Sequence, residues 1–171
     1  TNLTFDMNEE VRLVGGVRYT DNSLTGGHTD FRAGIVFSAT ENLVFKGLYG
    51  TSYRSPNHFE IFTKTPPILN GNENLDVETL NGLDLSATYS YENKFIGTVG
   101  FFWNETEDFI TRRVMGGVPT YTNIEGTKIM GIEYEGNFQP SPWLKAFVNG
   151  THIMDTEDLG SEEELDYVVE N

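Results

Sequence analysis

Apolar and polar residues alternate with a period of two along most of this chain, and this alternation limits the folds that the chain can adopt. In residues 80–91 one set of alternate positions is apolar: Leu83, Leu85, Ala87, Tyr89 and Tyr91. The other set is small or polar: Gly82, Asp84, Ser86, Thr88 and Ser90. Successive side chains of a β-strand point to opposite faces, so this segment predicts a strand with one apolar and one wet face.

The same alternation recurs often enough to predict an all-β, antiparallel up-and-down sheet. We expect eight strands, at about residues 2–7, 11–20, 29–38, 43–52, 79–91, 95–107, 127–138 and 143–154. Short connections at 8–10, 39–42, 92–94 and 139–142 take turns with longer segments at 21–28, 53–78, 108–126 and the tail from Asp155. This order places every tight turn at one end of the sheet and every long loop at the other. Transmembrane β-barrels of the outer-membrane type have that asymmetry.

A soluble β-sandwich or a lipocalin-like barrel also shows alternation, so this pattern alone leaves both classes open. The sorting of the loops favours the membrane barrel. No run of about 18 apolar residues occurs, so no transmembrane helix is predicted. The chain starts at Thr1 and not at Met, which we interpret as a processed or excised segment.

Composition argues against several other functions. The net charge of −15 leaves no basic patch for nucleic acid. There is no cysteine, and His28, His58 and His152 are far apart, so we predict no zinc site and no cofactor. Glu133 and Glu135 would share one strand face about 7 Å apart, but side by side they cannot flank a substrate, so we predict no catalytic residues and no enzyme.

Four short motifs follow one another in the order and spacing of a known family. They are YGTSYRSPNHFEIF at residues 49–62, GNENLDVET at 71–79, FFWNETEDFI at 101–110 and YTNIEGTKIMGIE at 121–133. Together they resemble the C-terminal β-barrel portion of TonB-dependent outer-membrane receptors, including vitamin B12 and siderophore receptors. The chain departs from the family pattern at Val77, where the family often has Pro, and at Ser55, where it often has Ala.

The resemblance implies that residues 1–171 are part of a larger barrel of roughly 22 strands, without its plug domain and closing strands. It further implies an outer-membrane receptor of a Gram-negative bacterium that imports a scarce nutrient, such as a siderophore–iron complex, cobalamin or an oligosaccharide. The implied partners are outer-membrane lipid, the receptor's own plug domain, the small nutrient ligand and the inner-membrane TonB complex, which the N-terminal part would contact.

Two sets of residues are candidates for contact with a ligand or the plug. The charged side chains on the polar faces would line the lumen: Arg12, Arg18, Arg32, Lys46, Asp84, Glu133 and Glu135. Their alternative role is to keep a wet wall solvated. In the loop after residue 53, Arg54, His58 and Phe59 are candidates for ligand contact on the extracellular side. The alternative there is a structural turn in which Pro56 fixes the backbone while Phe59 and Phe62 pack inward.

Aromatic side chains near the expected strand ends suggest the interfacial belt of a membrane barrel: Tyr19, Tyr49, Tyr89, Tyr91, Phe95, Trp103 and Trp143. Two other functions remain as alternatives to an import receptor. One is a stand-alone eight-stranded outer-membrane barrel with a structural or adhesion role, because eight strands can close. The other is a soluble all-β binding module.

Overall fold

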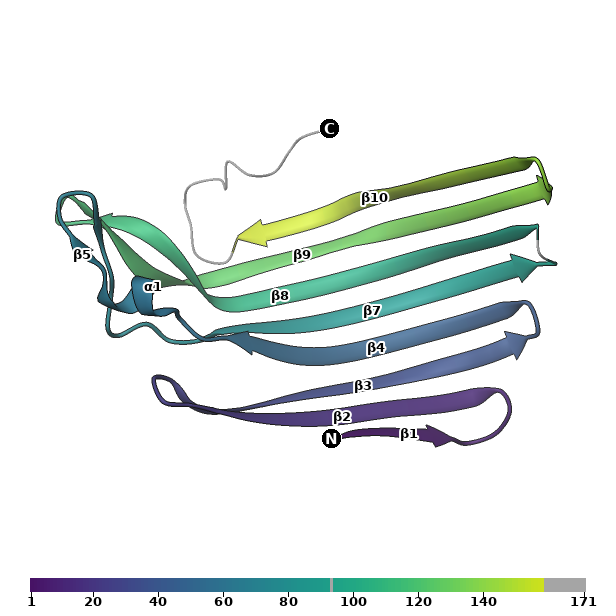
Figure 1. Cartoon of the computed structure of the whole chain (residues 1–171), viewed down its shortest axis with the longest axis horizontal. Coiled ribbons are helices and arrows are strands. Elements are labelled where there is room, and N and C mark those ends of the chain that lie inside the picture. The colour runs from purple at the N-terminus through teal and green to yellow at the C-terminus, as the bar shows by residue number, and fades with distance from the viewer. Residues whose placement is uncertain (93, 159–171) are drawn as a thin grey trace.

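The structure, a computed structural model, describes residues 1–92 and 94–158. It contains one ten-stranded sheet whose long strands run side by side and antiparallel (Figure 1). The eight long strands are β1 (Asn2–Asp6), β2 (Val11–Asn22), β3 (Gly26–Thr40), β4 (Leu43–Arg54), β7 (Glu78–Tyr91), β8 (Phe95–Met115), β9 (Val118–Ser141) and β10 (Leu144–Asp158).

Three small elements fill the connection between β4 and β7. The helix α1 (His58–Phe62) follows β4, and the two-residue strands β5 (Lys64–Thr65) and β6 (Leu69–Asn70) form a short hairpin after it. Asn70 of β6 pairs in parallel with Thr120 of β9. The connection between β4 and β7 is therefore bonded to a strand that is next to neither of them in the sheet. Among the described residues there is no helix with the length and apolar character needed to cross a membrane.

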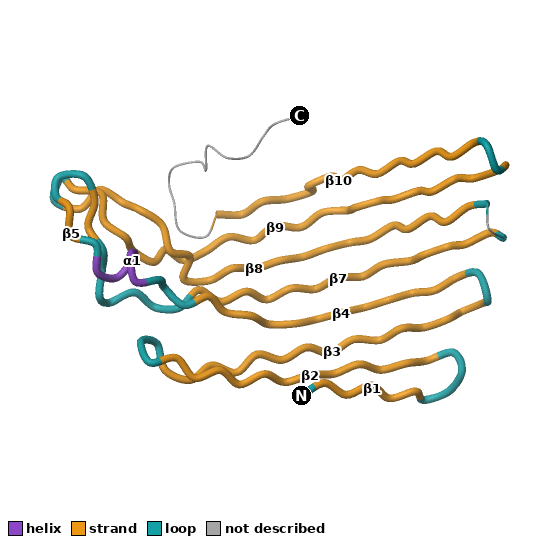
Figure 2. Tube along the Cα trace, viewed as in Figure 1, coloured by secondary structure: helices purple, strands orange, loops and turns teal. Residues whose placement is uncertain are grey.

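The sheet is open in the described part of the chain. β1 pairs with β2 alone and β10 with β9 alone, so the first and last strands do not close on one another. This arrangement fits a segment of a larger barrel and not a closed eight-stranded one. The turns that join β1 to β2, β3 to β4 and β9 to β10 lie at one end of the sheet, at the right in Figure 2, while α1 and β5 lie at the other end. The predicted sorting of the connections is therefore confirmed for these turns.

Two expected loops are largely strand. We expected a long connection at 108–126, but β8 runs to Met115 and β9 begins at Val118, with Gly116 and Gly117 as a two-residue turn. Both glycines have positive φ, +59° and +83°, which suits a type I′ hairpin turn. The expected connection at 21–28 is also shorter, because β2 continues to Asn22 and β3 starts at Gly26. β10 likewise continues to Asp158, and the rest of the expected tail lies outside the described residues.

The register confirms that alternate residues share a face from strand to strand. Leu85 pairs with Gly47 and Phe101, and the same row continues to Ile35 and Ile132. This apolar face carries large side chains with much of their area exposed: Leu3, Phe5, Val17, Phe31, Ile35, Phe37, Phe45, Leu85, Val99, Tyr134 and Phe138. An apolar surface of this extent must be covered by something other than water.

The tightly buried apolar side chains within the described residues lie elsewhere, at the loop end of the sheet. Ile61 of α1, Leu69 of β6 and Ile110 of β8 are 7%, 9% and 6% exposed. Ile61 and Leu69 belong to the connection between β4 and β7, whereas Ile110 is far from both in the sequence. The α1–β6 connection and the end of β8 therefore pack together as a small core of their own.

Candidate functional site

The strand register brings the seven charged candidates of the wall onto one face of the sheet, opposite the apolar face. Arg12, Lys46 and Glu133 even lie in a single row across the strands, in which Val36, Ser86 and Gly100 fill the positions between them. The other four candidates occupy neighbouring rows of the same face: Arg18, Arg32, Asp84 and Glu135. We call this surface the polar face. It is not uniformly polar, since Leu48 and Ile153 also lie on it.

The candidate charges are sorted by sign across the polar face. The basic ones lie on β2, β3 and β4, and the acidic ones on β7 and β9. Arg12 and Arg18 of β2 each form an ion pair with a carboxylate on a neighbouring strand. The Arg12 guanidinium lies 2.5 Å from Asp6, and the Arg18 guanidinium lies 2.7 Å from Asp30. Asp30 is buried, so the Arg18–Asp30 pair is the better protected of the two from solvent.

Five of the seven candidates have no ion pair with any residue in the described ranges: Arg32, Lys46, Asp84, Glu133 and Glu135. Lys46 and Glu133 lie three strands apart in the same row, about 14 Å at a strand spacing of about 4.8 Å, so they cannot reach one another directly. Only the small residues Ser86 and Gly100 stand between them. The Glu133 side chain lies against Gly100: a Cβ added at Gly100 would be 3.0 Å from the Glu133 Cγ.

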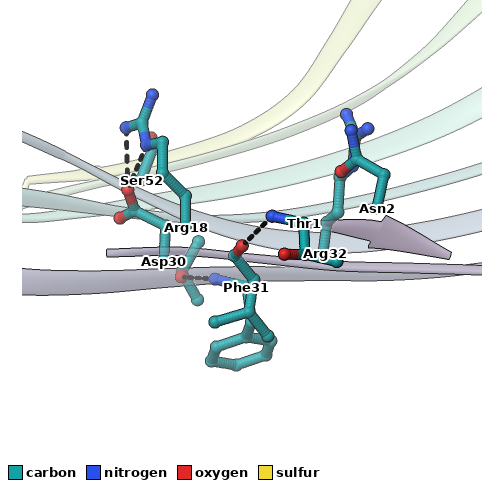
Figure 3. Close-up of a pocket in the computed structure, with 10 residues that line it drawn as sticks. Thr1, Asn2, Arg18, Asp30, Phe31, Arg32 and Ser52 are labelled. Atoms are coloured by element: carbon teal, nitrogen blue, oxygen red, sulfur yellow. Dashed lines mark hydrogen bonds and ion pairs between the residues drawn. The ribbon is translucent and has the colours of Figure 1, made fainter. Parts of the chain in front are cut away.

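A hollow of about 400 Å³ opens beside β1 at the basic side of the sheet (Figure 3). Arg18, Asp30 and Arg32 project from one side of the strands there, whereas the ring of Phe31 points to the other. The backbone N–H of Phe31 donates to Thr51 Oγ1 at 3.1 Å. The lining of the hollow offers the Arg32 guanidinium, the Arg18–Asp30 ion pair and hydroxyl groups, so the hollow suits an anionic or hydrogen-bonding neighbour.

At the loop end, the sequence builds α1 through a capping box. The Asn57 side chain accepts from the backbone N–H groups of Phe59 and Glu60, at 2.9 and 3.0 Å. The Glu60 carboxylate in turn accepts from the Asn57 N–H at 2.8 Å. This reciprocal pair satisfies the free N–H groups of the first turn, which is why a helix of five residues forms directly after Pro56.

Arg54 joins this helix to the sheet. Its Nη1 donates to both Glu60 oxygens at 3.0 and 3.1 Å, its Nη2 donates to Glu78 Oε1 at 2.7 Å, and its Nε donates to Glu78 Oε2. Glu78 Oε1 also accepts from the backbone N–H of Ile110 at 2.7 Å. We call this chain of contacts, from Ile110 through Glu78 and Arg54 to Glu60, the relay.

The two carboxylates of the relay are buried beside the Arg54 guanidinium. Glu60 and Glu78 are 9% and 8% exposed, and buried carboxylates are stable only when paired and hydrogen-bonded. Arg54 is the twelfth residue after a tight turn. A strand needs only about 9–11 residues to cross a bilayer, so Arg54 lies just beyond the part of β4 that would span the membrane. Hydrogen bonding to Glu78, the largest effect, raises the pKa of the Arg54 guanidinium above its ordinary value, although burial opposes this.

The three expected ligand-contact residues have different surroundings. Arg54 is fully engaged by the two carboxylates of the relay. His58 stacks on Phe62 with ring centroids 5.7 Å apart, and Phe59 meets Tyr121 of β9 edge-on at 6.4 Å. The alternative expectation that Phe59 and Phe62 pack inward is wrong: they are 58% and 48% exposed, because Ile61 occupies the buried side of this short helix.

Sequence reasoning did not name Asp30, Glu60 or Glu78 among the candidate residues. The Asn-x-x-Glu spacing of residues 57–60 is a capping-box signal that could have identified Glu60. The partners of Asp30 and Glu78 depend on strand register, which no local pattern gives. Within the described ranges, no group of three or more His, Cys, Asp or Glu side chains is arranged to hold a metal ion.

Comparisons with known proteins show which family this chain resembles. The sequence matches the family described as TonB dependent receptor-like, beta-barrel over residues 1–168. A curated relative, the vitamin B12 transporter BtuB of Vibrio vulnificus, is 28% identical over 131 residues, which are 75% of this chain and 21% of the relative.

Solved structures show the same fold. The siderophore receptor PirA from Pseudomonas aeruginosa matches with a TM-score of 0.82 at 19% identity, over 90% of this chain and 30% of that one. PirA from Acinetobacter baumannii gives a TM-score of 0.78 at 18% identity, over 90% and 27%. The FrpB iron transporter from Neisseria meningitidis gives 0.68 at 17% identity, over 89% and 24%.

This chain thus spans between about a fifth and a third of the length of these relatives. Its open antiparallel sheet corresponds to part of a barrel wall, as expected from the motif series at residues 49–133. The match to the family covers nearly the whole chain, and the chain therefore belongs to the TonB-dependent receptors of the Gram-negative outer membrane, of whose β-barrel it forms a segment.

Proposed function

We propose that this segment forms part of the barrel wall of a receptor that imports a scarce nutrient, with its apolar face against lipid and its polar face toward the lumen. The observation that carries the proposal is the sorting of side chains by strand register. The row of Leu85, Phe101 and Ile132 lies on one face, and the row of Arg12, Lys46 and Glu133 lies on the other. A transmembrane barrel with a polar interior requires this division.

On this proposal the seven charged candidates face the lumen, where they contact the receptor's plug domain or line the substrate route. Charge sorting supports a role in docking. An acidic group of the plug would meet Arg32 and Lys46, and a basic group would meet Asp84 and Glu133, which have no ion pair with a residue in the described part of this chain. Large barrels of this type hold a plugged lumen.

The nutrient that we propose is a metal chelate or cobalamin. The curated relative is named a vitamin B12 transporter, and the two PirA proteins are named siderophore receptors. An oligosaccharide remains the third possibility. The energy for import would come from the TonB system, as the family name implies, through parts of the protein outside residues 1–171.

A growth experiment tests this proposal. The gene that encodes this segment is deleted, and the strain is grown with ferric siderophores as the only iron source, with limiting cobalamin, or with a maltodextrin as the only carbon source. We expect loss of growth on one of the three nutrients and its return with the intact gene. Unchanged growth and unchanged uptake of all three labelled nutrients would contradict import of these classes.

A further inference from the structure

β8 and β9 continue past the point where the neighbouring strands end, as a hairpin that we call the arm (residues 109–125). The arm bends away from the line of the wall where it begins (Figure 2). Two residues with positive φ mark the bend, one on each strand: Asp108 at +54°, and Gly126 at +128°, which pairs with the residue before Asp108. The pairs Glu107–Gly126 and Phe109–Ile124 flank it in continuous register. The bend is therefore local to these two residues.

The bend depends on a missing side chain. A Cβ at Gly126 would lie 1.8 Å from the Thr106 carbonyl oxygen, a backbone atom that cannot move aside. Asp108 is one of the non-glycine residue types that adopt the left-handed conformation more readily than most. A bend formed by two residues in such conformations can change its angle without disturbing the hydrogen bonds on either side, as hinges do.

Two side chains, Glu78 outside the arm and Asn123 within it, bind the arm to its surroundings near this bend. Glu78, at the start of β7, accepts the N–H of Ile110, the second residue of the arm. Asn123, on the returning strand, accepts from the Asp76 N–H at 2.9 Å and donates to the carbonyl oxygens of Asp76 and Asp108, at 3.1 and 2.6 Å. Both ties lead to residues 76–78, so the arm is anchored to one short segment.

The relay extends the anchor to the rest of the loop end. Because Arg54 binds Glu78 and Glu60 at once, the arm, β4 and α1 are linked through charge-assisted hydrogen bonds, which are about twice as strong as neutral ones. Isolated two-stranded hairpins are marginally stable in water. The arm therefore depends for its direction on these links, on the pairing of Thr120 with Asn70 of β6 and on the burial of Ile110.

We propose that Glu78 is a positioning residue that sets the angle of the arm to the barrel wall, with Asp108 and Gly126 as the hinge. When the relay is broken, the arm swings. Because Tyr121 of the arm meets Phe59 of α1, this angle also fixes the spacing between the arm and α1. The proposal concerns the arm alone and does not depend on the nutrient or on import.

Distances between two spin labels test this proposal in the full-length receptor, with any cysteine outside this segment replaced by serine. Residues 1–171 contain none. One label goes on the arm at Val114, and the other on the wall at Leu3, both 72% exposed. A second pair, on Leu3 and Phe147, reports on the wall itself. Each pair is measured by pulsed electron spin resonance in the unchanged receptor and in Glu78→Ala, Glu78→Gln and Glu73→Gln.

In the unchanged receptor we expect one narrow distance distribution for the arm pair. Glu78→Ala removes both acceptors and should shift and broaden that distribution, while Glu78→Gln, which keeps one acceptor oxygen, should have a smaller effect. Glu73→Gln is the matched control, because Glu73 forms an exposed ion pair with Lys64 in the same connection. It should leave both distributions unchanged.

The wall pair decides between positioning and general damage. An altered arm distribution with an unchanged wall pair supports the proposal. An unchanged arm distribution in Glu78→Ala overturns it, and so does an equal change in both pairs, which would mean that Glu78 supports the wall. If Glu78→Ala does not assemble, Asn123→Ala removes the second tie, and an unchanged arm distribution in Asn123→Ala and in Glu78→Gln overturns the proposal.

Discussion

Arginine at position 85 should strongly destabilise the membrane-embedded receptor. Leu85 lies in the middle of β7, on the apolar face, with Gly47 and Phe101 as its cross-strand neighbours and nearly half of its side chain exposed. If that face contacts lipid, Leu85→Arg places a charge near the bilayer midplane. Such a substitution costs about 2–4 kcal/mol, or about 30-fold to about 700-fold in the folding equilibrium.

The neighbouring residue provides a matched control. Ser86 points to the polar face, where its cross-strand neighbours are Lys46 and Gly100. Ser86→Arg introduces the same side chain one residue along, and repulsion from Lys46 should cost less than about 1 kcal/mol. The comparison removes the general effect of arginine on a strand and leaves the effect of the face.

Urea unfolding of the full-length receptor in lipid vesicles, followed by tryptophan fluorescence, measures both variants. We expect a markedly lower urea midpoint for Leu85→Arg than for Ser86→Arg. Equal midpoints, or a lower midpoint for Ser86→Arg, would refute the assignment of the apolar face to lipid.

Three further substitutions test the loop end of the sheet. Arg54→Ala leaves two buried carboxylates without their cation, at a cost of about 1–3 kcal/mol for each unsatisfied group; residues 55–77 should become sensitive to protease, and unchanged resistance would argue against the relay. Asn57→Ala removes the cap of α1 and should cost about 0.5–2 kcal/mol, seen as faster hydrogen exchange at Phe59 and Glu60; unchanged exchange would count against the capping box. Gly126→Val forces a side chain against a backbone carbonyl and should abolish the heat-sensitive folded band on gels, whereas normal assembly would show that the bend tolerates a side chain.

The alternation of side chains was sufficient to predict the long strands and their faces. Strand β7, expected at 79–91, is observed at Glu78–Tyr91, and its apolar and polar sets separate as expected. This prediction is reliable because the two faces of a strand in a membrane barrel meet different solvents, so that every second residue is constrained. The tight turns at one end of the sheet were predicted from the short connections between these alternating segments.

The arm could not be predicted from alternation, because its residues face water on much of both sides. In the stretch from Thr111 to Met115, two adjacent arginines and two adjacent apolar residues break the period of two. Gly116 and Gly117 are nevertheless a recognised signal for a two-residue hairpin turn. That signal was present in the sequence, and it is better evidence for a hairpin than the loss of alternation is for a loop.

The contacts of the relay could not be predicted from the sequence for a different reason. Arg54 and Glu78 are 24 residues apart, and Glu78 and Ile110 are 32 apart. They meet because β4, β7 and β8 are neighbours in a particular register, which is a property of the sheet and not of any local pattern. The motif series at residues 49–133 pointed to these segments, and it gave no indication of which side chains contact one another.

The mass and location of the native gene product test the central claim most directly. An antibody against a peptide of this segment is applied to outer-membrane and soluble fractions. Since residues 1–171 have a mass of 19.2 kDa and match only about a fifth to a third of their relatives, we expect an outer-membrane band several times heavier than 19.2 kDa. An outer-membrane band near 19 kDa, or a band in the soluble fraction, would contradict the assignment to the wall of a large import receptor.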